Sequence, residues 1–452
     1  MTRAAILCVA AVGLTACTRD DLAAPRPHVS APNYDDISTL AQEVRTLAAG
    51  RGITPLVRPA PVRPELVRLG QALAFDKILS GNRDISCMTC HLPSFASGDG
   101  RSLPIGQGGT GLGPARTLGN GVFIPRNAPP LFNLFAFDAL FWDGRVSRDA
   151  QGRYHTPAGD QLTSKMTSVL EFGAASAQGL FPVTSRTEMR GVGGNELAAI
   201  ADQDFDEIWH ALMKRLGDIP DYRQLFEAAY PGTKFNQMTF AHAANAMAGF
   251  FIDQLSFTNS PWDQFLAGND NALTADQLDG AKTFLTLKCS ICHGGPAFTD
   301  RQFHNVALAQ FGPGEGDGTA GNDDFGRFRV TGQPADKYTF RSTPLRNVEL
   351  TGPYGHAGQF TDLAAFIDHY SESDLKLRAF DTSQLDPLLR GTLLPNAEDI
   401  LAARDPLLAG VVFGSDIVTK LRTYMQALTD DAARDVSRVA PSRVPSGLSV
   451  DR

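Results

Sequence analysis

The segments CMTCH, residues 87–91, and CSICH, residues 289–293, decide how this chain folds. Each places two thiols two residues apart and a histidine directly after the second thiol, which is the attachment pattern of c-type haem. The thiols reach the two vinyl groups of one porphyrin, and the histidine then lies under the iron as an axial ligand. The sequence therefore predicts two covalent haems, held by Cys87, Cys90, His91, Cys289, Cys292 and His293.

Three other chemistries use closely spaced cysteines: a redox CxxC pair, two disulfides, and one zinc site built from all four thiolates. The chain has 6 cysteines, and the two outside these pairs are Cys8 and Cys17 near the N-terminus. Two complete copies of the five-residue pattern, with no other cysteine in the body of the chain, favour haem over these alternatives.

The N-terminus has the sequence pattern of an export signal. Arg3 precedes a short apolar run from Ala4 to Leu14, which is too brief to span a bilayer. The residues ending at Cys17 are similar to a bacterial lipobox, so we expect a lipoprotein signal at 1–17; an ordinary signal peptide cut nearby is the alternative. Residues 18–63 are expected to form a flexible tether. The protein would then be periplasmic and anchored to the outer membrane by lipid.

Composition indicates a globular protein of two domains, since 452 residues exceed what one compact core usually holds. A net charge of −8 gives no electrostatic reason to expect a nucleic-acid partner. Periodic apolar residues predict helices before each CxxCH and over residues 415–428. No alternating pattern predicts a major sheet, so the expected fold is mainly α with long loops around the porphyrins.

Several ordered blocks surround the two CxxCH segments. They are LGQALAFDKILSGNRDISCMTCH, RNAPPLFN, LFWDGRV, LFPVTSRTEM, GRFRVTG and TFRSTPLRNVELTGPYGHAGQF. From about residue 64 to about 430 the chain resembles the bacterial di-haem cytochrome c peroxidase and MauG superfamily. The resemblance implies two cytochrome c-like domains, a peroxidatic one at 64–270 and a second at 271–430, followed by a tail at 431–452.

The resemblance also implies residue roles. Glu188 would be the acid/base of the peroxide site, with Gln178 and Pro182 beside it, and Trp142 would carry electrons between the haems. A carboxylate can take a proton from one peroxide oxygen and return it to the other. Trp209 and Trp262 lie outside the matching blocks and are expected to be structural.

The resemblance also implies a calcium site and one further residue near the haems. Asn127, Thr351 and Pro353 match positions linked to a calcium ion between the domains, and carbonyl oxygens suit that cation. His356 is expected near the haems, as a pocket wall or hydrogen-bond partner.

Two positions depart from classical peroxidases of this superfamily. Gln107 stands where a second histidine would close the resting peroxide haem, and the next histidine, His155, lies in an apparent insertion, so an open haem is expected. For the second haem, the ligand position of the family falls on Tyr370, as in the MauG-like branch, and His369 is its neighbour. The nearest later methionine, Met425, is expected in the core.

These features predict an exported enzyme that reacts with hydrogen peroxide, stores two oxidising equivalents across both haems and oxidises a protein partner. MauG and the methanobactin-associated di-haem enzymes are the implied models. A tryptophan exit like that of MauG is not evident, because Leu287 precedes Cys289 by two residues. The alternative is a cytochrome c peroxidase that takes electrons from a small redox protein, and a non-enzymatic di-haem electron carrier is the remaining class.

Overall fold

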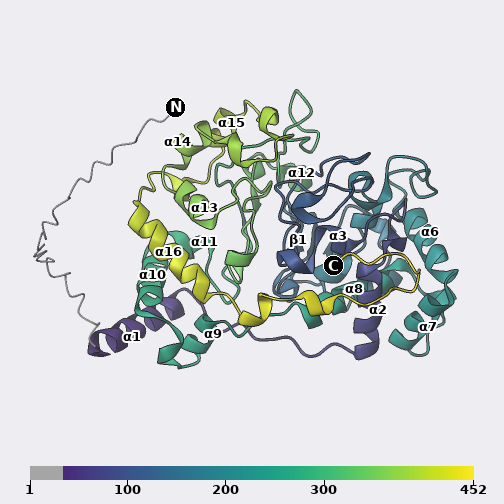
Figure 1. Cartoon of the computed structure of the whole chain (residues 1–452), viewed down its shortest axis with the longest axis horizontal. Coiled ribbons are helices and arrows are strands. Elements are labelled where there is room, and N and C mark those ends of the chain that lie inside the picture. Colours follow the sequence, from purple (N-terminus) through teal and green to yellow (C-terminus); the bar gives the residue numbers. More distant parts are fainter. Residues whose placement is uncertain (1–33) are drawn as a thin grey trace, which may run out of the picture.

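The computed structural model describes residues 34–452, and the predicted signal at 1–17 lies outside these residues. Helices and long loops form two halves side by side, each with its own hydrophobic core (Figure 1). We call them the first half, residues 54–260 with 431–452, and the second half, residues 34–53 with 261–430. The expected mainly α fold with long loops is confirmed.

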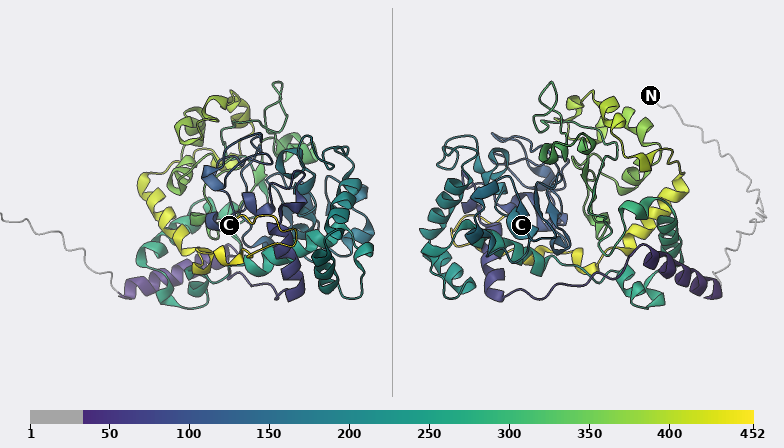
Figure 2. Two further views of the ribbon diagram at one scale, coloured as in Figure 1. Left: turned by 45° about the vertical axis from the view of Figure 1, so that its right-hand side comes forward. Right: turned by 180° about the vertical axis from the view of Figure 1, so that it is seen from behind.

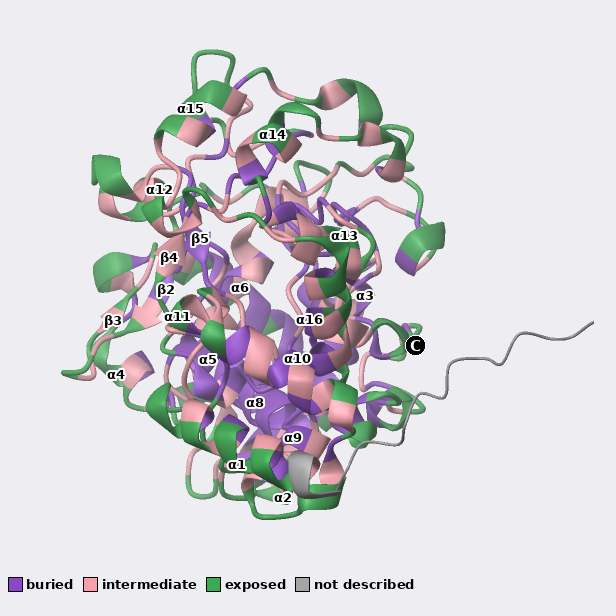
Figure 3. Ribbon diagram, turned by 90° about the vertical axis from the view of Figure 1, so that its left-hand side faces the viewer, coloured by how far each residue is buried: buried purple, intermediate pink, exposed green. Residues whose placement is uncertain are grey.

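The first half begins with helix α2 (Pro64–Phe75), which leads into the short helix α3 (Cys87–Cys90) of the first CxxCH. Five more helices follow: α4 (Ser164–Thr167), α5 (Ala174–Gln178), α6 (Phe205–Gly217), α7 (Pro220–Ala229) and α8 (Phe240–Gln254). Helix α8 is buried almost all round, and it forms the centre of the first core (Figure 3).

The second half repeats this beginning, with α10 (Ala275–Thr286) leading into α11 (Cys289–Cys292). Its other helices are α1 (Tyr34–Gly50), α9 (Pro261–Leu266), α12 (Phe328–Thr331), α13 (Leu363–His369), α14 (Ser373–Arg378), α15 (Ala397–Ala402) and α16 (Ser415–Ala427).

Extended structure is minor in the described residues. An antiparallel sheet of three short strands contains β1 (Ala139–Leu140), β2 (Val146–Arg148) and β3 (Tyr154–His155). A second, two-stranded sheet pairs β4 (Phe303–His304) with β5 (Phe340–Arg341).

A glycine sets the main helix crossing in each half. Helix α2 packs on α8 at Gly70, where an added Cβ would overlap the carbonyl oxygen of Ala246. Helix α10 packs on α16 at Gly280, where an added Cβ would overlap the carbonyl oxygen of Lys420. Because glycine lets two backbones approach this closely, both CxxCH segments start from a fixed helix pair.

The structure corrects the expected tether at 18–63 for its described part. Residues 34–50 form helix α1, and its apolar side packs on α10, with Ala41, Val44 and Ala48 fully enclosed in the second core. Proline and alanine suggested a flexible segment, but the apolar residues of α1 recur at helical spacing and find a partner far along the chain.

The domain boundary and the tail also differ from expectation. Helix α9 packs in the second core through Trp262 and Phe265, so the change of core falls near residue 260 rather than 270. Residues 431–452 run back along one face of the first half and add Val436, Val439 and Val444 to the first core (Figure 2). The tail therefore belongs structurally to the first half. No helix in residues 34–452 is long and apolar enough to cross a membrane.

We expect Gly70→Ala to destabilise the protein, although alanine favours helices intrinsically. The added methyl group has no space beneath Ala246, so α2 and α8 must separate, at a cost of about 2 kcal/mol or more in the free energy of unfolding. Thermal unfolding followed by circular dichroism measures this. Gly50→Ala, where a Cβ meets no atom within 4 Å, is the matched control. Equal melting temperatures for both variants would contradict the crossing.

Candidate functional site

One cavity of about 560 Å³ extends from the first CxxCH to the second and is walled by both halves. Its walls are mostly proline, aromatic and aliphatic side chains, with charged and polar groups set among them. All the site residues predicted from the sequence line it. These are Cys87, Cys90, His91, Asn127, Trp142, Gln178, Pro182, Glu188, Cys289, Cys292, His293, Thr351, Pro353, His356 and Tyr370.

The two CxxCH histidines are held in the same way. Nδ1 of His91 lies 2.9 Å from the carbonyl oxygen of Ser97, and Nδ1 of His293 lies 3.1 Å from that of Phe298. Donation from Nδ1–H to a carbonyl leaves the lone pair of Nε2 free, which is the arrangement of a metal-bound histidine. Burial lowers the pKa of both imidazoles, which favours this neutral form.

Arg341 gives an independent test of whether an anionic cofactor fits. Its guanidinium lines the cavity, and its Nε and one terminal nitrogen have no hydrogen-bond partner among the described residues. Burial lowers the pKa of Arg341 to about 10, yet the group is still charged at neutral pH. A buried cation without a hydrogen-bond partner is costly, and a porphyrin carboxylate would supply one. The residues present therefore fit haem.

Glu188 lies in a short π-helical turn, Arg186–Arg190, that begins at Ser185. The hydroxyl oxygen of Ser185 accepts from the Glu188 N–H at 3.3 Å, and the Glu188 carbonyl accepts from the Gln107 N–H at 3.0 Å. The backbone is thus held at both ends, while the carboxyl group faces the cavity. Burial raises the pKa of Glu188 to about 7. This is the value that suits a group taking and returning a proton near neutral pH.

Gln107 does not reach the cavity with its side chain. The side chain is buried next to Gly191 and is absent from the cavity wall. His155 lies on β3, is largely exposed, and pairs with Asp149 at 3.0 Å. Neither residue lines the cavity, and the expected open position above the first haem stays a prediction.

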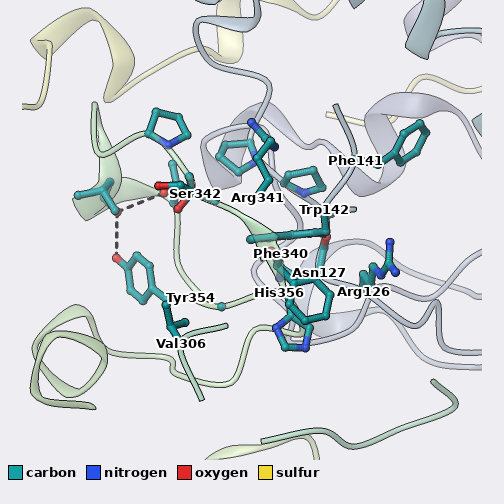
Figure 4. Close-up of a pocket in the computed structure, with 18 of the residues that line it drawn as sticks. Arg126, Asn127, Phe141, Trp142, Val306, Phe340, Arg341, Ser342, Tyr354 and His356 are labelled. Atoms are coloured by element: carbon teal, nitrogen blue, oxygen red, sulfur yellow. Dashed lines mark hydrogen bonds between the residues drawn. The ribbon is translucent and has the colours of Figure 1, made fainter. Parts of the chain in front are cut away.

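Four residues tie the two halves together at the middle of the cavity (Figure 4). The indole N–H of Trp142 donates to the carbonyl of Asn127 at 2.8 Å, and the carbonyl of Trp142 accepts from the Arg341 N–H at 2.8 Å. The Asn127 N–H donates to the His356 carbonyl at 2.8 Å. Trp142 and Asn127 belong to the first half, while Arg341 and His356 belong to the second. The expected tryptophan is therefore bonded to both halves.

His356 forms part of the cavity wall by stacking. Its ring lies parallel to Phe340, with centroids 3.6 Å apart, and the two rings are drawn face to face in Figure 4. Burial lowers the pKa of His356 to about 3, so the imidazole is neutral.

At the second CxxCH, the structure separates the two neighbouring ligand candidates. Tyr370 lines the cavity. His369 is buried behind it, absent from the cavity wall, and its Nε2 lies 3.0 Å from the carbonyl oxygen of Val306. Burial raises the pKa of Tyr370, so a tyrosinate there needs a cation bonded to it. Met425, expected in the core, is buried in the second core and also lines the cavity.

The single zinc site considered as an alternative has no counterpart in residues 34–452. The four paired cysteines are free thiols that do not gather into one ligand group. Cys292, Asp300 and His304 do come together. However, the two ring nitrogens of His304 already face carboxylates, Asp405 at 2.6 Å and Asp300 at 2.8 Å.

Sequence reasoning missed a buried ion cluster on the cavity wall. Arg126 is enclosed and contacts both oxygens of Asp324, at 2.7 and 2.8 Å, and one of Asp143 at 2.6 Å. Arg126 adjoins Asn127 in a block that was singled out, but Asp324 is 198 residues away. Because nothing local in the sequence pairs them, only the fold reveals the cluster. Trp209 and Trp262 are core residues, as expected.

The chain is similar in sequence to a known protein family and to proteins that belong to it. The family model for di-haem cytochrome c peroxidase matches residues 64–271. The methylamine utilization protein MauG of Methylorubrum extorquens is 30% identical over 70% of this chain and 71% of its own length. Cytochrome c551 peroxidase of Pseudomonas aeruginosa is 30% identical over 68% of this chain and 72% of its own.

Two solved structures share the fold. A MauG-like protein associated with microbial copper homeostasis superposes with a TM-score of 0.60 at 25% identity, covering 86% of this chain and 97% of that one. The di-haem peroxidase BthA of Burkholderia thailandensis superposes with a TM-score of 0.55 at 19% identity, covering 84% of this chain and 92% of its own.

Three substitutions identify the ligand at the second site. We expect Tyr370→Phe to change the optical spectrum of one haem in the holoprotein, because Tyr370 faces the cavity. His369→Ala and Met425→Leu should leave the spectrum of the ferric protein as it is. A change with Met425→Leu alone would assign a thioether ligand instead, and a change with His369→Ala alone would contradict the observed side-chain directions.

Proposed function

Because this chain belongs to the di-haem cytochrome c peroxidase family, we propose that it uses hydrogen peroxide to oxidise a protein partner, in the manner of MauG. Membership makes it an oxidoreductase that acts on peroxide and implies two c-type haems. The observation that supports oxidation of a protein partner is the cavity shared by the two halves, with Glu188 near one CxxCH and Tyr370 near the other.

The chain has thiols and a histidine that would bind each haem. Cys87 and Cys90 would bond one porphyrin and Cys289 and Cys292 the other, with His91 and His293 as iron ligands. Tyr370 would be the sixth ligand of the second haem, and the Arg341 guanidinium a partner for a propionate. When bound, haem iron supplies the redox chemistry that breaks the O–O bond.

Glu188 transfers the proton in this reaction. Its carboxylate accepts a proton from one peroxide oxygen and returns it to the other oxygen, which leaves as water. Gln178 and Pro182 line the same cavity and would orient the peroxide and exclude water. In total, peroxide takes two electrons from the partner and two protons from solvent and yields two waters.

Trp142 provides the route for electrons between the two halves. Its indole N–H donates to the Asn127 carbonyl, and its backbone carbonyl accepts from the Arg341 backbone N–H, so the ring is held by the first half and the backbone by the second. A fixed, electron-rich ring between two redox groups shortens each electron step. We propose that electrons taken from a partner at the second half pass this residue on their way to the peroxide site.

A second candidate function is reduction of peroxide with electrons from a small redox protein. The presence of Met425 on the cavity wall favours it, because a thioether ligand suits an electron-accepting haem of high potential. Mixing the holoprotein with peroxide, and then with a reduced small cytochrome, decides between the two. Rapid oxidation of the cytochrome supports this candidate.

Two further assignments complete the proposal. Asn127, Thr351 and Pro353 all line the cavity, and the Asn127 amide donates to the carbonyls of Arg101 and Ser102, which turns its oxygen toward other partners. A calcium ion between the halves is proposed at these residues. The lipobox ending at Cys17 supports a periplasmic protein with a lipid anchor.

We expect Glu188→Gln to slow peroxide consumption by ~10²-fold or more, because the amide cannot accept a proton. In the unmodified protein the rate should rise with pH through about pH 7, since Glu188 accepts a proton only when ionised and burial places its pKa near there. Stopped-flow kinetics between pH 5 and 9 measures both. A pH-independent rate, or a Glu188→Gln variant of full speed, would remove Glu188 from this role.

Oxidation of a protein partner has a direct test. After peroxide is added to the ferric holoprotein together with proteins exported alongside it, mass spectrometry should find oxygen added to, or hydrogen removed from, a side chain of one partner. The Glu188→Gln holoprotein is the matched control. Peroxide consumption without any modified partner, coupled instead to cytochrome oxidation, would favour the second candidate.

A further inference from the structure

The tail, residues 431–452, contacts the attachment segment of the first haem. The hydroxyl of Thr89, the third residue of CMTCH, donates to the Asp451 carboxylate at 2.5 Å. The same carboxylate pairs with the ammonium group of Lys77 at 2.7 Å. Thr89 and Asp451 are both buried. A carboxylate 362 residues further along the chain is therefore bonded directly to the first CxxCH.

The Thr89 hydroxyl links Asp451 to the backbone of the CMTCH helix. Its oxygen accepts from the Ser86 backbone N–H at 2.9 Å, while its proton is donated to Asp451. Ser86 directly precedes the helix, and at the other end the His91 N–H donates to the Cys87 carbonyl at 3.1 Å. Both thiols and the histidine thus belong to one short turn, and Asp451 holds the start of that turn through Thr89.

The second CxxCH cannot be held in this way. Ile291 occupies the position of Thr89 in CSICH, and it is 40% exposed. An aliphatic side chain has no group that could donate to a carboxylate. The bond from the tail therefore distinguishes the first attachment segment from the second.

The tail does not need the Asp451 charge in order to dock. Its three valines named above lie in the first core, and the Ser446 hydroxyl donates to Asp76, just after α2, at 2.5 Å. The buried pair of Asp451 with Lys77 adds little stability, because the desolvation of two charges offsets much of their attraction. What the pair provides is direction, since a carboxylate fixed by Lys77 accepts from Thr89 in one orientation.

We propose that Asp451 is a positioning residue for the first haem: acting through the Thr89 hydroxyl, it fixes the CMTCH helix and with it the porphyrin that this helix would hold at the peroxide site. Its effect on the peroxide reaction rests on the proposed function, whereas two c-type haems are implied by the family. Asp451 touches no reacting atom. It acts as an outer hydrogen-bond partner, and such partners orient the groups that hold a metal and tune its reactivity.

The test compares the two haems of the ferric holoprotein by electron paramagnetic resonance, which gives one set of signals for each haem. We expect Thr89→Val and Asp451→Ala to change the same set and to leave the other unchanged. Because both substitutions break one bond, the double variant should change that set no further than either single variant. Stopped-flow kinetics should show peroxide consumption slowed by about tenfold or more in each.

Matched controls separate positioning from stability. Thr89→Ser keeps the hydroxyl and should retain the signals of the unmodified protein. Ile291→Val, at the equivalent position of the second CxxCH, and Asp435→Asn, at an exposed carboxylate of the tail, should leave the affected set as it is. Thr89→Val and Asp451→Ala break the bond from opposite sides, so either one decides if the other does not fold.

Signals that stay unchanged in both Thr89→Val and Asp451→Ala would overturn the inference, even if the melting temperature of either variant falls. An unmodified holoprotein that does not react with peroxide would instead overturn the proposed function, and the two sets of signals would still decide the role of Asp451.

Discussion

An ion cluster around the buried guanidinium of Arg126 joins the two walls of the cavity on which this protein depends. The arginine's partners Asp143 and Asp324 come from the first and second halves, so the ion cluster crosses the boundary between them. Removing one partner of a buried ion pair typically costs about 3–5 kcal/mol, because the other charge is left without compensation. The cavity wall is therefore made by residues of both halves together.

The two halves share one arrangement around CxxCH and differ in the groups that face the cavity. In each, a helix crosses another at a glycine, leads into CxxCH, and presents a histidine whose Nδ1 is bonded to a backbone carbonyl. Beyond that, the first half offers a carboxyl group to its side of the cavity, and the second offers a phenol. In the function proposed above, identical attachment with different neighbours would let one site receive peroxide and the other exchange electrons.

Local patterns in the sequence predicted the attachment residues, the helices before them and the mainly α fold. Family register also placed Glu188, Trp142 and Tyr370 on what proves to be one cavity wall. What failed was anything that depends on contacts between distant segments: helix α1 packs on α10, and the tail returns to the first core. Arg341 and Asp451 escaped notice for the same reason, since a single arginine or aspartate has no local sign that it is buried.

In the function proposed above, one haem of the resting protein is open to peroxide while the other has six ligands. Electron paramagnetic resonance of the ferric holoprotein measures this without any partner or substrate. We expect one high-spin and one low-spin signal for each chain, with the high-spin signal altered when peroxide is added. Two low-spin signals that peroxide leaves unchanged would contradict it and identify the protein as an electron carrier.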